Sequence, residues 1–170
     1  MFQLALLSSV LAFGFGPLHP AQTVTHTYRE PSWKMAITRD RFTGAVRCRV
    51  YLGSAARPDV AYARQSLAFR FDHRLNTLQA AYRVDGGEAR AWTLVYPALV
   101  EQGATLPGAS LENPTGGLVI LPVSAMAGGH TIVIRPTPRS QPRAFWIDGL
   151  TDIVANARQQ GCASDAAFLR

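Results

Sequence analysis

The amino-acid sequence predicts a mainly-β protein, an antiparallel β-sandwich or open barrel with one C-terminal α-helix. Three observations support this prediction. Several short segments alternate apolar and polar residues with a period of two, turn-forming residues separate these segments, and helical spacing is clearest near the C-terminus. The 170 residues suit one domain, and 48% of them are hydrophobic, which is enough to form a core.

The N-terminal region has features of an export signal. Residues 1–22 carry no charged side chain, and the apolar run Phe2–Phe13 has the length of a signal-peptide core but is short for a membrane span. We therefore predict a signal peptide at residues 1–21, cleaved after Ala21, and a single mainly-β domain at residues 22–170. The mature chain is expected in the periplasm or outside the cell, without a transmembrane segment. A hydrophobic first strand or a retained anchor is the alternative.

The first predicted strands follow a polar lead-in at Thr23–Pro31. Trp33–Arg39 alternates apolar and polar residues, as a half-buried strand does. The next strand is predicted at Ala45–Leu52. The face expected to lie toward the core carries Val46, Cys48 and Val50, and the outward face carries Arg47, Arg49 and Tyr51. Gly53–Asp59 is predicted to be a loop, and Ser66–Phe71 the following strand.

A hairpin is the clearest prediction in the middle of the chain. Segments Thr77–Val84 and Glu88–Val95 flank Asp85-Gly86-Gly87, whose residues tolerate the positive φ of a tight turn. Pro97–Gly117 is rich in glycine and proline and is predicted to be a long loop. Long loops in compact domains often carry function, so this loop is a candidate binding surface, although an ordinary connection is the commoner explanation.

Three strands and a helix are predicted for the C-terminal part. The strands are Leu118–Val123, His130–Arg135 and Ala144–Ile147. Beyond them, one face of a helix is formed by Leu150, Ile153, Val154 and Ala157. Asp148 is expected to cap the start of this helix, and Gly161 to end it.

The chain has two cysteines, Cys48 and Cys162. In an exported protein such a pair favours a disulfide. Cys48 lies on the predicted core face of its strand, and Cys162 directly follows the helix terminator Gly161. We therefore predict one disulfide, which holds the C-terminal helix beside the strand Ala45–Leu52. A redox role is the alternative, but the two cysteines do not have the spacing of a CxxC motif.

The chain is basic, with a net charge of +6, and Lys34 is the only lysine among its 17 basic residues. Arginine binds carboxylates and phosphates through two parallel hydrogen bonds, so an anionic ligand is conceivable. The arginines are scattered along the chain rather than grouped in one block, and no nucleic-acid partner is expected. If they converge on a concave face in space, an anionic ligand is favoured over an ordinary solvated surface.

The sequence contains no recognisable catalytic, metal-binding or nucleotide-binding motif. Asp72-His73 and Asp85 could join a catalytic triad only if folding brought them to a nucleophile, so no catalytic, cofactor-binding or metal-ligating residue is predicted. No cofactor is expected. Core packing is the default role of the three tryptophans, Trp33, Trp92 and Trp146. An exposed tryptophan among arginines would instead suit a platform for a glycan or a peptide.

A signal peptide, a strand at Trp33, an early Cys48 and a late Gly161-Cys162 beside a helix follow one another along the chain. This layout resembles small secreted bacterial proteins of the invasion-associated locus B type, although that family usually has further cysteines. The resemblance implies a β-sandwich in the periplasm or at the outer surface, in a family linked to host-cell entry. It carries over no functional residue.

Two classes of function are compatible with these observations. We expect an exported, non-enzymatic binding or accessory module whose partner is a protein, a peptide or an envelope component. The alternative is a hydrolase of unfamiliar type that acts on a cell-envelope polymer, which requires a concave site with convergent polar residues.

Overall fold

The structure is a computed structural model, and it describes residues 22–27, 33–44, 46–54, 56–63, 65–101 and 109–162. The predicted signal peptide at residues 1–21 lies outside the described residues. Among the helices of the described part, none is long and apolar enough to cross a membrane.

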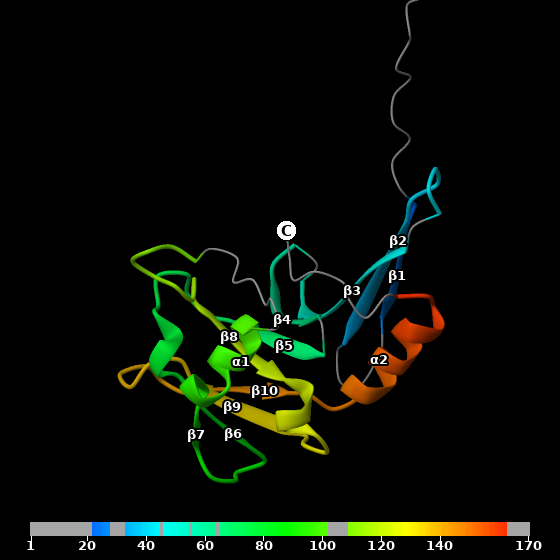
Figure 1. Ribbon diagram of the computed structural model, residues 1–170. Coiled ribbons are helices and arrows are strands. Elements are labelled where there is room, and N and C mark those ends of the chain that lie inside the picture. Colours follow the sequence, from blue (N-terminus) through cyan, green and yellow to red (C-terminus); the bar gives the residue numbers. More distant parts are fainter. Residues whose placement is uncertain are drawn as a thin grey trace, which may run out of the picture.

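The described residues form two antiparallel sheets (Figure 1). The first sheet has the order β1-β2-β3-β4-β5-β8, with strands Gln22–Thr27, Lys34–Arg39, Val46–Gly53, Pro58–Ala63, Ser66–Arg70 and Leu118–Pro122. The second has the order β10-β9-β6-β7, with strands Arg143–Trp146, Thr131–Arg135, Ala81–Val84 and Arg90–Ala91. The helices are α1 (Tyr96–Glu101), α2 (Leu150–Gln159) and the 3-10 turns η1 (Thr77–Gln79), η2 (Trp92–Leu94) and η3 (Val123–Met126).

The core lies between the two sheets. Phe69 of β5 meets Phe145 of β10 edge to face, with ring centroids 5.0 Å apart. The indole N–H of the fully buried Trp92 donates to the carbonyl oxygen of Ile120 on β8, so this polar group has an acceptor. The residues of β8 up to its final proline are all buried, as its continuous apolar sequence predicts. The predicted mainly-β fold is confirmed, and its two separate sheets make it a sandwich.

Helix α2 packs against β2 and β3 and buries the predicted apolar face. Ile153 is fully buried, and Ala157 is nearly so. Gly161 ends the helix with a left-handed φ of +80°. The next residue, Cys162, is bonded to Cys48 of β3, with Cα atoms 5.5 Å apart. The C-terminal helix therefore lies beside β3, as the predicted disulfide requires.

The start of α2 differs from the prediction. The N-cap is Gly149, with a φ of +75°, and no side chain caps the helix there. The Asp148 carboxylate is instead hydrogen-bonded to the ring of His130. The prediction that Asp148 caps α2 is wrong, because a partner from another part of the chain takes up its side chain.

Two strands lie where the sequence predicted none. β1 occupies part of the expected polar lead-in, and it pairs with β2 along its whole length. β4 begins inside the predicted loop Gly53–Asp59. Val60 and Ala61 on opposite faces of β4 are both buried, so this strand shows no alternation of apolar and polar residues. Tyr51, expected to face outward, is only 3% exposed.

The predicted hairpin is present, but its arms are shorter. β6 and β7 pair across a turn in which Asp85 and Gly86 have φ angles of +46° and +76°. The outer parts of both arms, expected to be strand, form η1 and η2 instead. The Asn76 side chain accepts the backbone N–H of Leu78 and so caps η1.

The predicted loop Pro97–Gly117 is partly helical. α1 covers its start, and residues 102–108 lie outside the described part of the chain. Proline fits within the first turn of a helix, because the N–H it lacks would have no partner there. A loop prediction based on proline content is therefore wrong for 97–101.

Candidate functional site: an arginine-lined pocket

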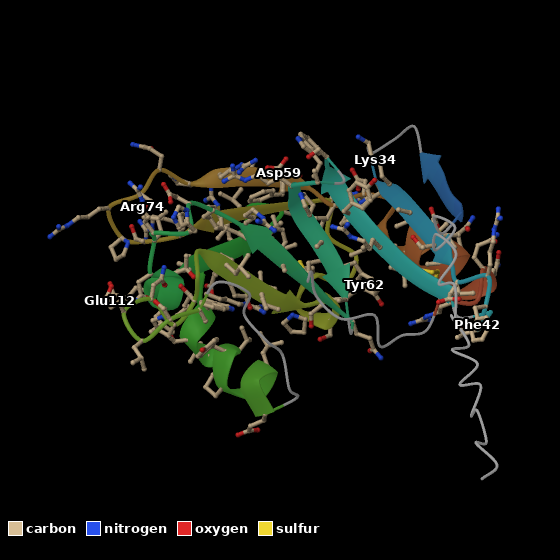
Figure 2. The ribbon with its side chains drawn as sticks, turned by 90° about the horizontal axis from the view of Figure 1, so that it is seen from above. Lys34, Phe42, Asp59, Tyr62, Arg74 and Glu112 are labelled. Carbon is tan, nitrogen blue, oxygen red and sulfur yellow. A yellow bond between two sulfur atoms is a disulfide. The ribbon has the colours of Figure 1, made fainter. Side chains whose placement is uncertain are left out.

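A pocket of about 580 Å³ opens where the two sheets meet at one end of the sandwich. Residues from the start of β4, from the end of β5 with the turn that follows it, and from the start of β10 form its walls. They are Arg57, Pro58, Asp59, Arg70, Phe71, Asp72, His73, Arg74, Leu75 and Arg143. Figure 2 shows Asp59 beside the orange β10 and Arg74 at the end of the molecule opposite to Phe42.

The turn after β5 is held by short hydrogen bonds within it. A carboxylate oxygen of Asp72 accepts the backbone N–H of Arg74 at 3.0 Å, and the carbonyl oxygen of Asp72 accepts the N–H of Leu75 at 2.9 Å. This is the local geometry that aspartate favours in turns. It directs the side chains of residues 72–74 to one wall of the pocket.

A second segment braces this turn from behind. The side-chain amide of Asn113 donates to the carbonyl oxygens of His73 at 2.6 Å and Leu75 at 3.1 Å. Gly117 lies so close that a Cβ atom at this position would be 2.2 Å from the carbonyl oxygen of Asp72. The described end of the predicted loop Pro97–Gly117 therefore supports the pocket wall and does not line it.

An ion pair joins the two sheets at the pocket mouth. The Arg143 guanidinium of β10 donates to the Asp59 carboxylate of β4 at 2.8 Å. The same guanidinium lies 4.9 Å from the centroid of the Phe145 ring. Both side chains of the ion pair are about half exposed (48% and 49%), so the pair adds little to stability. The ion pair and the contact with the Phe145 ring instead fix the orientation of the Arg143 guanidinium at the edge of the cavity.

Arg70 contributes a hydrogen-bond donor that no described residue satisfies. Its Nε atom is buried, and it has no hydrogen-bond partner in the described part of the protein. Leaving such a buried donor unpaired costs about 1–3 kcal/mol. Phe71, the next residue, packs edge to face against Phe145, with ring centroids 6.0 Å apart, and this contact fixes the chain beside Arg70.

The pocket carries more positive than negative charge. Four arginines and two aspartates line it. Asp59 is paired with Arg143, and Asp72 with the N–H of Arg74 and, at 3.4 Å, with the His73 ring. The backbone hydrogen bond from Arg74 lowers the pKa of Asp72, with smaller effects from the charges of His73, Arg74 and Arg57. Both carboxylates thus have partners within the pocket, while the arginines remain in excess.

The catalytic-triad candidates from the sequence are not brought together. Asp72 and His73 line the pocket, but no serine, threonine or cysteine is among its lining residues. Asp85 lies in the β6–β7 turn, where its carboxylate accepts the backbone N–H groups of His130 and Thr131. No cluster of three or more histidine, cysteine, aspartate or glutamate side chains in the described residues could hold a metal ion.

The sequence analysis did not name the individual arginines that line this candidate site. Arg57, Arg70, Arg74 and Arg143 come from three separate stretches of the chain. The arginine-rich composition was visible in the sequence, but their convergence depends on the pairing of distant strands. No protein-family model, curated protein or solved structure matches this chain, so the resemblance to the invasion-associated locus B type stays a prediction.

Proposed function

We propose that this protein is an exported, disulfide-stabilised binding module that holds an anionic group, a carboxylate or a phosphate, in the arginine-lined pocket. The observation that carries the proposal is the convergence of four arginines on one concave site, which holds only two aspartates, both of them paired. Dispersed arginines would have carried no such implication.

Arginine suits this role for a geometric reason. Its planar guanidinium presents parallel N–H groups that match two oxygens of a carboxylate or a phosphate. A concave site with walls of low dielectric strengthens the attraction between such cations and an anion. Phe71 and Leu75 add apolar wall, so the site can also contact the uncharged part of a ligand.

Binding fits the lining better than catalysis does. The lining supplies cations and N–H donors, while a hydrolase acting on an envelope polymer would also need a nucleophile or an activated water. Export is supported by the uncharged N-terminal region and by the disulfide, which persists mainly in oxidising compartments. The layout shared with the invasion-associated locus B type supports the same compartment.

The proposal is tested by titrating the purified mature protein with inorganic phosphate and, separately, with succinate at low ionic strength. Calorimetry should detect binding of at least one probe. The double variant Arg57→Ala with Arg74→Ala should bind it at least about 100-fold more weakly, since it removes two charge-assisted hydrogen bonds that each contribute about 1.5–3 kcal/mol. The Arg74 change leaves intact the backbone N–H that Asp72 accepts.

Arg158→Ala is the matched control, because Arg158 is an exposed arginine on α2 and does not line the pocket. It should bind the probe as the wild type does. Failure of the wild type to bind either probe at millimolar concentration, or equal binding by the double variant, would refute the proposal.

A further inference from the structure

Trp146 is the one tryptophan that the fold leaves exposed. Its side chain is 65% exposed, whereas Trp33 and Trp92 are 0% exposed. It lies on β10, where Phe145 points into the core, so Trp146 points away from the core on the outer face of the second sheet. The exposed Trp146 side chain takes no part in the core packing described above.

The strand register identifies the neighbours of Trp146 on this face. Trp146 lies opposite Thr131, Ala144 opposite Val133, Val133 opposite Arg83, and Arg135 opposite Ala81. Residues opposite one another on paired strands project to the same side of the sheet. The tryptophan face therefore consists of Ala81, Arg83, Thr131, Val133, Arg135, Ala144 and Trp146.

The small side chains of this face leave the tryptophan ring accessible. Ala144 and Thr131 are too short to cover an indole beside them. A hollow of about 250 Å³ continues the face between Arg83 and Arg135, over Ala81 and Val133. Neighbouring strands lie roughly 4.8 Å apart and the rise along a strand is about 3.4 Å per residue. Trp146 and Arg83 lie two strands and two residues apart, so their backbones are separated by about 12 Å. An extended ligand can contact both.

The tryptophan face is positively charged. Arg83 and Arg135 are exposed, and neither forms an ion pair with any residue in the described part of the chain. Two carboxylates near this face, those of Asp85 and Asp148, are already engaged. Asp85 accepts the N–H of Thr131 at 2.7 Å, and Asp148 is hydrogen-bonded to the His130 ring. The cations thus remain available for an external anion.

We propose that the tryptophan face binds an acidic oligosaccharide, a chain of sugar rings that carry carboxylates. The indole of Trp146 offers a flat apolar surface on which the C–H face of a sugar ring stacks. Arg83 and Arg135 then pair with carboxylates further along the chain. The complementary charge of the ligand, and the placement of two arginines on the same sheet face as an exposed aromatic ring, favour this occupant over a neutral glycan.

The location of the tryptophans gives a direct test in the intact mature protein. Because Trp33 and Trp92 are buried, acrylamide quenching of the fluorescence reports mainly on Trp146. Oligogalacturonate should protect the fluorescence from acrylamide, and the fully methyl-esterified oligomer should protect it much less. In the background of Arg57→Ala with Arg74→Ala, which disables the arginine-lined pocket, calorimetry should show at least a tenfold weaker affinity for oligogalacturonate in Trp146→Ala and in Arg83→Ala combined with Arg135→Ala.

Matched variants separate this site from the arginine-lined pocket. Arg57→Ala with Arg74→Ala should leave the protection of the Trp146 fluorescence by oligogalacturonate unchanged, and Leu94→Ala, which alters another exposed hydrophobic residue, should do so too. Full affinity in the Trp146 variant or in the Arg83 and Arg135 variant would overturn the proposal. Tighter binding of poly-glutamate than of oligogalacturonate would also overturn it, in favour of an acidic peptide.

Discussion

At the scale of single residues, His130 joins three parts of the fold. Its ring is hydrogen-bonded to Asp148 just before α2, and its backbone N–H donates to Asp85 in the β6–β7 turn. The hydrogen bond with Asp148, followed by the charges of Asp148 and Asp85, raises the pKa of His130. The N–H groups of Thr131 and His130 lower the pKa of Asp85. The carboxylates of Asp148 and Asp85 thus stabilise the protonated form of the His130 ring.

This arrangement predicts a pH dependence of stability. The pKa of His130 is higher in the folded protein than the value of 6.5 expected for the unfolded chain. Its contribution to stability is therefore fully present below pH 6.5, and it is lost as the pH rises through the raised folded pKa. Thermal unfolding between about pH 5 and 9 should show a loss of Tm over this window.

The variant Asp148→Asn should reduce that slope, because the largest cause of the raised pKa is removed. Asp148 does not cap α2, so the helix itself should remain. His73→Gln serves as control, since it removes an exposed histidine that lies 3.4 Å from a different aspartate, Asp72. An unchanged slope in Asp148→Asn would contradict this account.

At the scale of elements, the contact between segment 109–117 and the turn after β5 shapes the pocket wall. Gly117 has a φ of +75°, and a Cβ there would be 2.2 Å from the carbonyl oxygen of Asp72. The clash is with backbone, so it cannot be relieved by rotating a side chain. The bracing segment can therefore lie this close to the turn only because it has glycine at this position.

Gly117→Ala should accordingly destabilise the protein more than Gly128→Ala. Both glycines have a positive φ, +75° and +76°, but a Cβ at position 128 would meet nothing within 4 Å. Backbone strain alone costs about 1–3 kcal/mol, so Gly128→Ala measures that part and the excess measures the clash. Urea unfolding gives both free energies of unfolding. Equal losses would mean that the close approach to Asp72 is not needed.

The elements that the sequence predicted are those with one dominant physical signal. β2 and β3 show a period of two, β8 is a continuous apolar run, and α2 has a helical stripe. β1 and β4 lacked such signals, because β1 is mostly polar and depends on pairing with β2, while β4 is buried on both faces without alternation. Short-range patterns indicate local structure, but they do not indicate which strands pair.

Sequence patterns do not indicate which strands pair, and this also explains which features of the candidate sites could be predicted. The cysteines could be assigned to each other, since the sequence offers only one pair. The arginines were visible as a composition, but the pocket requires Arg57 and Arg143 to meet across two sheets. The idea of a tryptophan platform was available, yet the exposed position of Trp146 follows from the pairing of β10 with β9.

At the scale of the whole molecule, the disulfide joins residues 114 positions apart. In the chain-entropy model, closing a loop of this size stabilises the folded state by about 4–5 kcal/mol. Domains are typically stable by only about 5–15 kcal/mol, so the double variant Cys48→Ser with Cys162→Ser should have a markedly lower Tm. Differential scanning calorimetry of the oxidised wild type and this variant gives the comparison.

The reducing agent itself supplies the control. Reductant should lower the Tm of the wild type toward that of the serine variant, and it should leave the variant unaffected. A wild-type Tm that does not respond once the thiols are shown to be free would mean that the link between α2 and β3 contributes nothing to stability.

The covalent ring closed by the Cys48–Cys162 disulfide also determines what a single proteolytic cut does to the molecule. All residues that line the pocket, and all residues of the tryptophan face, belong to the covalent ring that the disulfide completes. A protease that cuts this ring once, for example in the exposed stretch around Arg139 between β9 and β10, leaves the two pieces covalently joined. A molecule nicked in this way would keep the pocket and the tryptophan face on one covalent unit as long as the disulfide stays oxidised.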